Sequence, residues 1–533
     1  MDADVNEISA TELMKTISSD EEIAIVDIRE KGHFGLEHLL HAANIPFSEF
    51  EPGILLQVPR RTTRIVLIDG IDSVAPRAEE RLRELGYVTI DRLTGGVDAW
   101  RDAGGEVFIG EDVTPKAFGE IIEEELHTPA LNPQDVAALI GKGEDVVILD
   151  GRTWPEHQGV SIPGSISVPN GELLLRLPDL VKDPQTTVVV TCAGRTRSII
   201  GAQTLINAGV ENPVYALRGG TQAWRMAGLS LHNGSTNRFA EVTPEGAARA
   251  EAFANDLRRK TDIPDIAQAD VERIAAEGQR NLYRLDVRTR EEFDDGHIAG
   301  SVHAPGGQLV QGVIRWCAVR KGLLVLIDSA PFVRAVSAAH WLRQMGYDAR
   351  VLQGGVAGAT AQVVQDDPPP AIPSLTSVAQ IDADHARRLH GGKVLTIDVG
   401  ASMDYRHSHI AGAVWAIRPR LEAVSALVRQ ADSIIVYSAV AARALLFAAD
   451  LKRLFPDRDV CVLDGGLSAW VAAGGEVETT PHAPPDEACI DYLFWAHDRQ
   501  KGNDAATLQY FNWEHGLPNQ INRDGTSEFR ILK

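Results

Sequence analysis

The stretch that decides the fold begins as a short apolar run and ends in a polar loop. It reads Thr187-Val188-Val189-Val190-Thr191-Cys192-Ala193-Gly194-Arg195-Thr196-Arg197-Ser198. Continuous runs of β-branched residues are typical of strands buried on both faces of a parallel sheet. A helical pattern follows over about residues 198–208, and Gly209 stands where a helix commonly ends. The stretch therefore predicts a strand, a loop and a helix of an α/β sheet.

Two marks recur four times along the chain. One is an apolar run that ends in an aspartate, at Asp27, Asp150, Asp286 and Asp398. The other is a Gly-Gly pair after a later apolar run, at Gly95-Gly96, Gly219-Gly220, Gly354-Gly355 and Gly465-Gly466. Because the two sets of spacings agree to within about one residue, the sequence predicts tandem copies of one unit. Each copy is expected to be a small, mostly parallel sheet with helices on both faces, so the fold class is α/β.

The repeats and the segments between them divide the chain into eight parts. The four copies are expected at residues 1–112, 130–232, 263–364 and 375–480, and they are called copies one to four below. Connecting helices are predicted over 113–129 and 233–262, with Thr114 and Thr243 as N-caps before a proline. A proline-rich linker covers 365–374. The tail, 481–533, is rich in aromatic residues, so we expect it to pack on the body of the protein.

The overall composition narrows the class of protein. The 533 residues include 52 basic and 74 acidic side chains, and this acidic balance argues against a nucleic-acid partner. No run approaches the roughly 18 apolar residues of a membrane span, and the acidic start does not resemble a signal peptide. A cytoplasmic protein without membrane association is therefore expected. The four cysteines show neither CxxC nor zinc spacing, which predicts reduced thiols and no metal site.

Cys192 stands in the loop between the strand and the helix of copy two. Successive backbone N–H groups in such a loop can surround an anion, and the helix N-terminus adds partial positive charge. Arg195 and Arg197 add two cations, and Gly194 permits a tight backbone path. Cationic surroundings favour the thiolate form of a cysteine. The loop therefore predicts a nucleophilic sulfur that attacks a small, electrophilic oxyanion.

Three segments of copy two together resemble the rhodanese family of sulfurtransferases. They are Asp150-Gly151-Arg152, Cys192 to Arg197, and Arg218-Gly219-Gly220-Thr221-Gln222-Ala223-Trp224. The resemblance implies that Cys192 takes the outer sulfur of thiosulfate, releases sulfite, and passes the sulfur from a persulfide to cyanide, a small thiol or a protein acceptor. It implies a ping-pong reaction without an external cofactor. It also implies that the transferred sulfur and the oxyanion are held by Ala193, Gly194, Arg195, Thr196, Arg197 and Ser198, with Arg152 as the weakest candidate.

The other copies lack the cysteine. Alignment on the strand end and the last arginine of the loop places Ser329 and Ser438 opposite Cys192 in copies three and four, and Gly70 begins the matching stretch of copy one. A serine hydroxyl without an adjacent base is a poor nucleophile and cannot hold a persulfide. Copies one, three and four are therefore expected to be inert in sulfur transfer, and to support the active copy, bind a partner or wall its site.

Other polar and sulfur-containing residues have structural interpretations. We interpret Asp150 and Arg152 as a pair that fixes the end of their strand. Single histidines in the turns after the first strand of a copy, and tryptophans in the Gly-Gly segments, are typical of packing. No role is assigned to His157, His297, His409, Cys317, Cys461, Cys489 or Trp224.

Two other functions stay open at this stage. A phosphatase or arsenate reductase would use cysteine and arginine on an anion loop, but phosphatases that resemble rhodaneses have Cys-x5-Arg. Here the arginine lies five residues after Cys192, and Ser198 lies six residues after it. A sulfur carrier or persulfide-binding scaffold with a dedicated protein partner is the second alternative, because three of the four copies lack a nucleophile.

Overall fold

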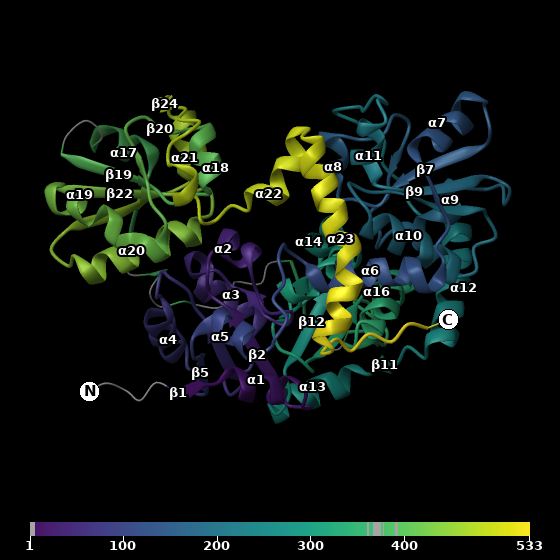
Figure 1. Cartoon of the computed structure of the whole chain (residues 1–533), viewed down its shortest axis with the longest axis horizontal. Coiled ribbons are helices and arrows are strands. Elements are labelled where there is room, and N and C mark those ends of the chain that lie inside the picture. The colour runs from purple at the N-terminus through teal and green to yellow at the C-terminus, as the bar shows by residue number, and fades with distance from the viewer. Residues whose placement is uncertain are drawn as a thin grey trace. The chain divides into compact units, whose positions relative to one another are not determined.

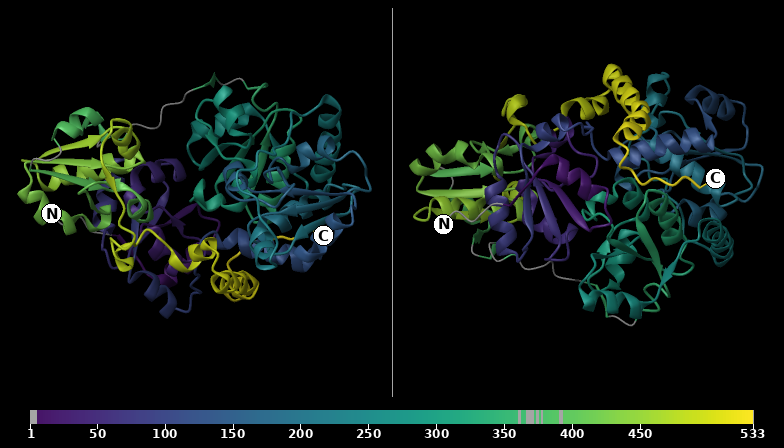
Figure 2. Two further views of the ribbon diagram at one scale, coloured as in Figure 1. Left: turned by 90° about the horizontal axis from the view of Figure 1, so that it is seen from above. Right: turned by 60° about the horizontal axis from the view of Figure 1, so that its bottom comes forward.

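Four sheets of five strands each form the framework of the protein. The computed structural model describes residues 6–359, 362–365, 372, 375, 376, 378–389 and 393–532. Within these residues every one of the four sheets has the same strand order and only parallel neighbours. Figures 1 and 2 show the strands of each copy enclosed by helices. The predicted fold of four tandem α/β copies is confirmed.

The chain divides into two compact units. One unit contains copy one without residues 17–22, copy four, and the first part of the tail, to Phe494. The other contains copies two and three, both connecting helices and the rest of the tail, from Trp495. Copies that are adjacent in the sequence are therefore not always partners in space, since copy four packs with copy one.

The first unit is built from two of the sheets. In copy one the order is β1 (Asn6–Ile8), β5 (Ile90–Leu93), β4 (Arg64–Ile68), β2 (Ile23–Asp27), β3 (Ala43–Asn44), with helices α1 (Ala10–Ile17), α2 (Lys31–Leu36), α3 (Phe50–Gln57), α4 (Ala75–Glu84) and α5 (Gly96–Asp102). In copy four it is β18 (Ala379–Ile381), β23 (Asp459–Leu463), β22 (Ser433–Tyr437), β19 (Val394–Asp398), β21 (Val414–Trp415), with helices α17 (Ala383–Leu389), α18 (Ser402–His407), α19 (Ser425–Gln430), α20 (Ala441–Leu454) and α21 (Gly466–Ala472). A short antiparallel pair, β20 (His409–Ile410) and β24 (Val477–Glu478), closes copy four.

The second unit repeats this plan. In copy two the order is β6 (Ala130–Leu131), β10 (Val214–Leu217), β9 (Thr187–Thr191), β7 (Val146–Asp150), β8 (Ile166–Ser167), with helices α7 (Pro133–Gly141), α8 (Trp154–Gly159), α9 (Leu173–Leu180), α10 (Thr196–Asn207) and α11 (Gly220–Met226). In copy three it is β11 (Asp265–Ile266), β16 (Asp348–Leu352), β15 (Leu323–Ile327), β12 (Leu282–Asp286), β14 (Val302–His303), with helices α13 (Gln268–Glu277), α14 (Arg290–Asp295), α15 (Gly306–Gln311) and α16 (Val333–Gln344). The pair β13 (His297–Ile298) and β17 (Val363–Val364) is antiparallel.

The connecting helices and the tail belong to these packed units. Helix α12 (Pro244–Thr261) begins as expected, because the Thr243 side chain accepts a hydrogen bond from the Gly246 N–H. Helix α6 (Val113–Leu126) begins two residues earlier than the predicted N-cap implies, after Asp112 in a left-handed conformation, so Thr114 is not its N-cap. The tail contains α22 (Phe494–His497) and α23 (Asp504–Asp524), and α23 packs against α6. Residues 366–371, 373 and 374 of the predicted linker lie outside the described residues.

Apolar strands with both faces covered form the cores, as their composition predicts. Val188, Val189 and Val190 of β9 are fully buried, and Trp224 of α11 packs on the same sheet. The Trp224 indole N–H donates to the Ser230 carbonyl oxygen at 3.0 Å, so this residue has the packing role expected for it. Among the described residues, no helix combines the length and apolar character of a membrane span, and no cluster of ligating side chains could hold a metal ion.

Candidate active site

Cys192 is the first residue after β9, at the carboxyl end of a central strand. Its neighbour Thr191 pairs with Asp150 at the end of β7, so the thiol lies where ligands commonly bind in open α/β sheets. The side chain is 2% exposed, and Sγ lies 3.0 Å from Ser198 Oγ on the first turn of α10. The loop between Cys192 and α10 therefore wraps a buried thiol at the N-terminus of a helix.

The Gly-Gly turn supports this loop from the side. Gly219 and Gly220 both have positive φ, and a Cβ on Gly220 would lie 2.2 Å from the Cys192 carbonyl oxygen. Only glycine permits such a close approach of two backbone segments. The carbonyl oxygens of Cys192 and Ala193 accept hydrogen bonds from Thr221 N–H and Gln222 N–H, at 2.8 and 3.2 Å. The repeated Gly-Gly mark thus fixes the path of the cysteine loop.

Among the residues that the structure describes, the N–H groups of the cysteine loop have no competing side-chain acceptor. Within the described part of the chain, no side chain accepts a hydrogen bond from the backbone N–H groups of residues 193–198. These groups include the predicted binding residues Ala193, Gly194, Thr196 and Ser198. Helix α10 begins at Thr196, so its first N–H groups have no partner within the helix either. Such an arrangement can hold a small anion beside the thiol.

Arg197 lies beside the thiol but is already paired. Its guanidinium donates two hydrogen bonds to the Glu156 carboxylate, at 2.8 and 2.7 Å. Burial alone would raise the pKa of Glu156, but the hydrogen bonds and charge of Arg197 lower it to about 2. Arg197 is close enough to Cys192 for the two groups to interact electrostatically. An incoming anion would share this arginine with Glu156.

Arg195 faces a different element. Its guanidinium donates to the Glu120 carboxylate at 2.7 and 2.8 Å and also to Glu123, both on helix α6. Burial opposes its charge, but these carboxylates raise the pKa of Arg195 above its ordinary value. The sequence predicted that both arginines would hold one oxyanion. The structure instead shows Arg195 joining the cysteine loop to the connecting helix, because two glutamates of that helix are within its reach.

Asp150 and Arg152 form the structural pair that the sequence analysis favoured. Arg152 is 2% exposed and donates to both carboxylate oxygens of Asp150 and to the Val160 carbonyl oxygen, all at 3.1 Å or less. His157 Nδ1 lies 2.9 Å from the same carboxylate. Arg152 is committed to this network, which makes it a poor candidate for substrate binding.

The C-terminal helix α23 reaches the cysteine loop, which the sequence analysis did not predict. A side-chain carbon added at Gly194 would lie 3.7 Å from Phe511 Cε1 and 3.9 Å from Glu514 Oε2. Glu514 is 2% exposed, its Oε2 has no hydrogen-bond partner among the residues that the structure describes, and burial raises its pKa to about 7. The aromatic content of the tail was the available signal, but it could not show which surface the tail covers.

Comparison with known proteins places these features in a family. The model of the rhodanese-like domain matches residues 9–103, 132–227, 268–362 and 382–473, which is most of the chain. The chain belongs to the rhodanese-like family. The crystal structure of a thiosulfate sulfurtransferase from Pseudomonas aeruginosa superposes with a TM-score of 0.92 and 38% identity, over 99% of this chain and 100% of that one. Together the family and this neighbour support a rhodanese-type sulfurtransferase at the level of the family.

A curated relative covers a smaller region. An uncharacterized protein of Synechocystis sp. is 32% identical over 95 residues, which are 18% of this chain and 52% of that protein. This rhodanese-like chain therefore spans about half the length of the curated relative it matches.

The strand register corrects the alignment of the four rhodanese-like copies. The residue that follows the central strand, where copy two has Cys192, is Asp69 after β4, Asp328 after β15 and Ser438 after β22. The prediction that Ser329 and Gly70 occupy this position in copies three and one was wrong by one residue. The assignment of Ser438 was right. The alignment failed because the loops that precede the last arginine differ in length.

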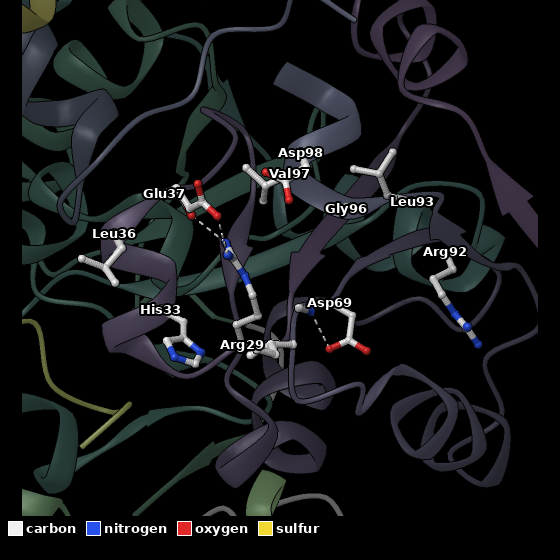
Figure 3. Close-up of a pocket in the computed structure, with 13 residues that line it drawn as sticks. Arg29, His33, Leu36, Glu37, Asp69, Arg92, Leu93, Gly96, Val97 and Asp98 are labelled. Atoms are coloured by element: carbon white, nitrogen blue, oxygen red, sulfur yellow. Dashed lines mark hydrogen bonds and ion pairs between the residues drawn. The ribbon is translucent and has the colours of Figure 1, made fainter. Parts of the chain in front are cut away.

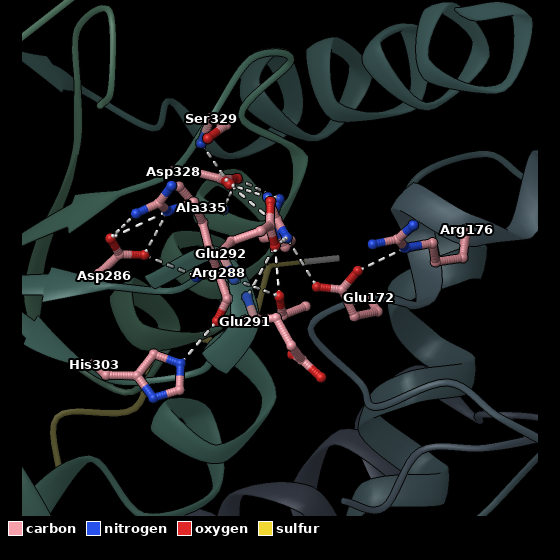
Figure 4. Close-up of polar contacts among 12 residues, drawn as sticks. Glu172, Arg176, Asp286, Arg288, Glu291, Glu292, His303, Asp328, Ser329 and Ala335 are labelled. Carbon is pink, nitrogen blue, oxygen red and sulfur yellow. Dashed lines mark hydrogen bonds and ion pairs between the residues drawn. The ribbon is translucent and has the colours of Figure 1, made fainter. Parts of the chain in front are cut away.

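In copy three the carboxylate of Asp328 fills the anion-binding position of the loop. Its oxygens accept hydrogen bonds from the N–H groups of Ser329, Arg334 and Ala335, at 2.8, 3.0 and 3.1 Å. Arg334 Nε donates to the same carboxylate at 2.9 Å. Figure 4 shows Asp328 with Ser329 and Ala335 beside it. Copy three therefore has a carboxylate of its own chain where copy two has the Cys192 thiol.

Copy one follows the same principle with a more open site. The Asp69 carboxylate accepts hydrogen bonds from Gly70 N–H and Ala75 N–H, at 2.8 and 2.7 Å. Asp69, Arg29, Glu37 and Arg92 line a cleft of about 750 Å³ at this end of the sheet (Figure 3). In copy four the smaller Ser438 hydroxyl accepts a hydrogen bond from Val440 N–H at 3.1 Å.

Proposed function

We propose that this rhodanese-like protein transfers sulfane sulfur from thiosulfate to cyanide or a thiol through a persulfide on Cys192. The observation that carries the proposal is the position of Cys192, a thiol at the end of β9 whose surrounding N–H groups have no side-chain acceptor among the described residues. The likeness of the whole chain to a protein described as a thiosulfate sulfurtransferase supports thiosulfate as the donor.

In the first half-reaction the Cys192 thiolate attacks the outer sulfur of thiosulfate. A new S–S bond forms on the protein, and the bond between the two sulfur atoms of thiosulfate breaks, with its electron pair leaving on sulfite. The N–H groups of residues 193–198 would stabilise the charge on the transferred sulfur. Arg197 would hold the departing oxyanion, sharing its charge with Glu156.

In the second half-reaction the carbon of cyanide, or the sulfur of a thiolate, attacks the outer sulfur of the persulfide. The S–S bond breaks and its electron pair returns to Cys192 as the thiolate, so thiocyanate or a new persulfide leaves. No metal ion or organic cofactor takes part in either step. The two half-reactions define a ping-pong cycle with one covalent intermediate.

The test is thiocyanate formation from thiosulfate and cyanide by the whole chain, with Cys192→Ser beside it. We expect measurable turnover that the substitution abolishes, and intact mass after thiosulfate treatment should show one added sulfur atom on the Cys192 peptide. Cys461→Ser, in a core strand of copy four, is the matched control and should retain turnover. Turnover that survives in Cys192→Ser would overturn the assignment.

A sulfur carrier that serves a dedicated protein partner is the second candidate. The observations that favour it are the burial of Cys192 and the presence of Phe511 and Glu514 over the loop. A carrier would form a stable Cys192 persulfide but show little turnover with cyanide. Hydrolysis of an aryl phosphate that depends on Cys192 would instead favour the phosphatase alternative.

A further inference from the structure

Copy three makes a buried ionic contact with copy two close to the proposed active site. Arg334 Nη1 lies 3.1 Å from Glu172 Oε1, and the two residues are 3% and 4% exposed. Arg334 is also held by Asp328 and, through both terminal guanidinium nitrogens, by Glu292. Since these carboxylates fix the arginine inside copy three, Arg334 offers Glu172 a rigid anchor.

Glu172 belongs to a turn of copy two that begins at Asn170. The other oxygen of Glu172 accepts a hydrogen bond from Arg176 Nε at 2.8 Å, so both ends of the carboxylate are bound. The backbone of the turn lies directly against copy three, because a Cβ on Gly171 would be 2.8 Å from the Gly307 backbone nitrogen. The turn is therefore held by side-chain and backbone contacts from the neighbouring copy.

Asn170 connects this turn to the cysteine loop. Its Nδ2 donates to the Arg197 carbonyl oxygen at 2.9 Å, and its backbone N–H donates to the Gly151 carbonyl oxygen at 3.1 Å. A Cβ on Gly151 would lie 2.0 Å from Asn170 Oδ1, and one on Gly201 of α10 would lie 2.9 Å from it. Asn170 is therefore wedged between the turn after β7 and the helix that carries the loop.

The corresponding positions in the other copies show that the close fit of Asn170 against Gly151 is specific to copy two. Phe47, Gly306 and Arg418 lie two residues after the N–H group that bonds to the carbonyl of the strand aspartate, as Asn170 does. The residue equivalent to Gly151 is isoleucine or valine in these copies: Ile28, Val287 and Val399. Glycine at 151 and asparagine at 170 thus occur together in the copy that has the thiol, and steric fit explains why.

Asn170 also lines a small cavity of about 10 Å³. It is lined from copy two by Asn170, Thr196 and Arg197 and from copy three by Gly307 and Gln311. Three polar atoms here are buried without a hydrogen-bond partner in the described part of the chain: Asn170 Oδ1, Thr196 Oγ1 and Gln311 Oε1. Polar groups from both copies thus converge at the N-terminus of α10.

We propose that Asn170 is a positioning residue for the Cys192 loop, and that Arg334 of copy three acts on the proposed active site by fixing Asn170 through Glu172. The inference rests on the proposed role of Cys192. It gives copy three, which has Asp328 where copy two has Cys192, a defined part in the reaction, because the direction of the loop N–H groups depends on where the Arg197 carbonyl is held. Loss of the Asn170 side chain should weaken the binding of anions beside the thiol. It should have a smaller effect on the reaction of the thiol with neutral reagents.

The experiment measures how strongly the Cys192 loop favours an anionic reagent over a neutral one. Alkylation of Cys192 by iodoacetate and by iodoacetamide is followed by peptide mass, and the ratio of the two rates is compared between wild type and variants. For Asn170→Ala we expect the ratio to fall about tenfold, and the KM for thiosulfate to rise more than kcat falls, since small displacements of a catalytic loop have effects of this size. For Arg334→Met we expect a change of the same kind but smaller, about threefold.

A matched control exists in the other unit. Arg443 of copy four lies five residues after Ser438, as Arg197 lies five after Cys192, and it bonds to Glu49 of copy one at 2.6 Å. Arg443→Met breaks an ion pair between two copies that both lack a cysteine in this loop. It should leave the ratio of the two alkylation rates at Cys192 unchanged. If Arg334→Met fails to fold, Glu172→Gln takes its place. This variant removes the charge of the Arg334 partner and keeps the size of the side chain.

The proposal is overturned if Asn170→Ala leaves both the alkylation ratio and the KM at wild-type values. It is also overturned if Arg443→Met shifts the ratio as much as Arg334→Met does, because the effect would then be a general loss of stability. The alkylation ratio needs no turnover. If wild type shows no thiosulfate activity but Asn170→Ala still changes the ratio, the proposed function fails while the positioning role of Asn170 stands.

Discussion

The loop after β9 in copy two and the loop after β15 in copy three start at the same point of the same fold. They carry different chemical groups there, a thiol in copy two and a carboxylate in copy three. In copy three the N–H groups at the start of α16 are bound by the Asp328 carboxylate, and Arg334 completes the site. In copy two the equivalent position holds the Cys192 thiol. The residue that follows the central strand therefore determines what faces the loop N–H groups. A carboxylate of the chain occupies them in copy three, whereas the thiol of copy two leaves them open to an external anion.

The largest expected effect comes from making copy two like copy three. Cys192→Asp should place a carboxylate among the loop N–H groups, as Asp328 does, and should abolish thiocyanate formation completely because no sulfur nucleophile remains. The protein should stay folded, since copy three shows that the loop accepts aspartate. Turnover is measured with thiosulfate and cyanide, and folding by thermal unfolding. A Cys192→Asp protein that still formed thiocyanate would contradict the assigned nucleophile.

The second prediction removes the internal anion of copy three. Asp328→Asn leaves Arg334 with one carboxylate fewer in a buried site, and breaking a buried ion pair costs about 3–5 kcal/mol. Asp69→Asn in copy one is the matched variant. Its carboxylate is partly exposed and caps the start of α4 through Ala75 N–H, so its loss should cost only about 1 kcal/mol. Denaturant unfolding checks both, and equal losses would contradict the distinction.

The third prediction separates the two arginines of the cysteine loop. Arg197 lies beside Cys192, so Arg197→Met should raise the KM for thiosulfate about tenfold, as expected for loss of one charged hydrogen-bonding partner. Arg195 joins the loop to α6 through Glu120, so Arg195→Met should change that KM less than about threefold while lowering thermal stability. The measurement is steady-state kinetics beside a melting curve. A larger KM effect for Arg195→Met would restore the view that both arginines hold the oxyanion.

These comparisons show what the sequence could and could not reveal. The four-copy α/β fold follows from hydrophobic patterning and repeated glycines, because both are local properties of the chain. The alignment of Ser329 with Cys192 was wrong, since loops of unequal length hide the register that strand pairing fixes. The partners of Arg195 and the approach of Glu514 depend on segments far apart in the sequence, and charge patterns do not specify such contacts.

The smallest expected effect concerns the C-terminal helix over the cysteine loop and depends on pH. Burial raises the pKa of Glu514 to about 7, against 4.5 for an ordinary glutamate. A carboxyl whose pKa is raised by folding contributes stability that is fully present below about pH 4.5 and is lost as the pH rises through about 7. The docking of α23 should therefore weaken between pH 5 and pH 8 in the wild type.

Glu514→Gln should remove that dependence, because glutamine keeps the shape of the neutral acid and cannot ionise. We expect wild type and variant to show equal hydrogen exchange in residues 504–524 at pH 5, and the variant to exchange roughly threefold more slowly than wild type at pH 8. Comparing variants at one pH cancels the intrinsic effect of pH on exchange. Glu251→Gln, an exposed carboxylate on α12, should leave exchange in α23 unchanged at both values. A constant difference between wild type and Glu514→Gln at the two pH values would mean that Glu514 acts through packing alone, and that the charge of this residue does not control the cover on the Cys192 loop.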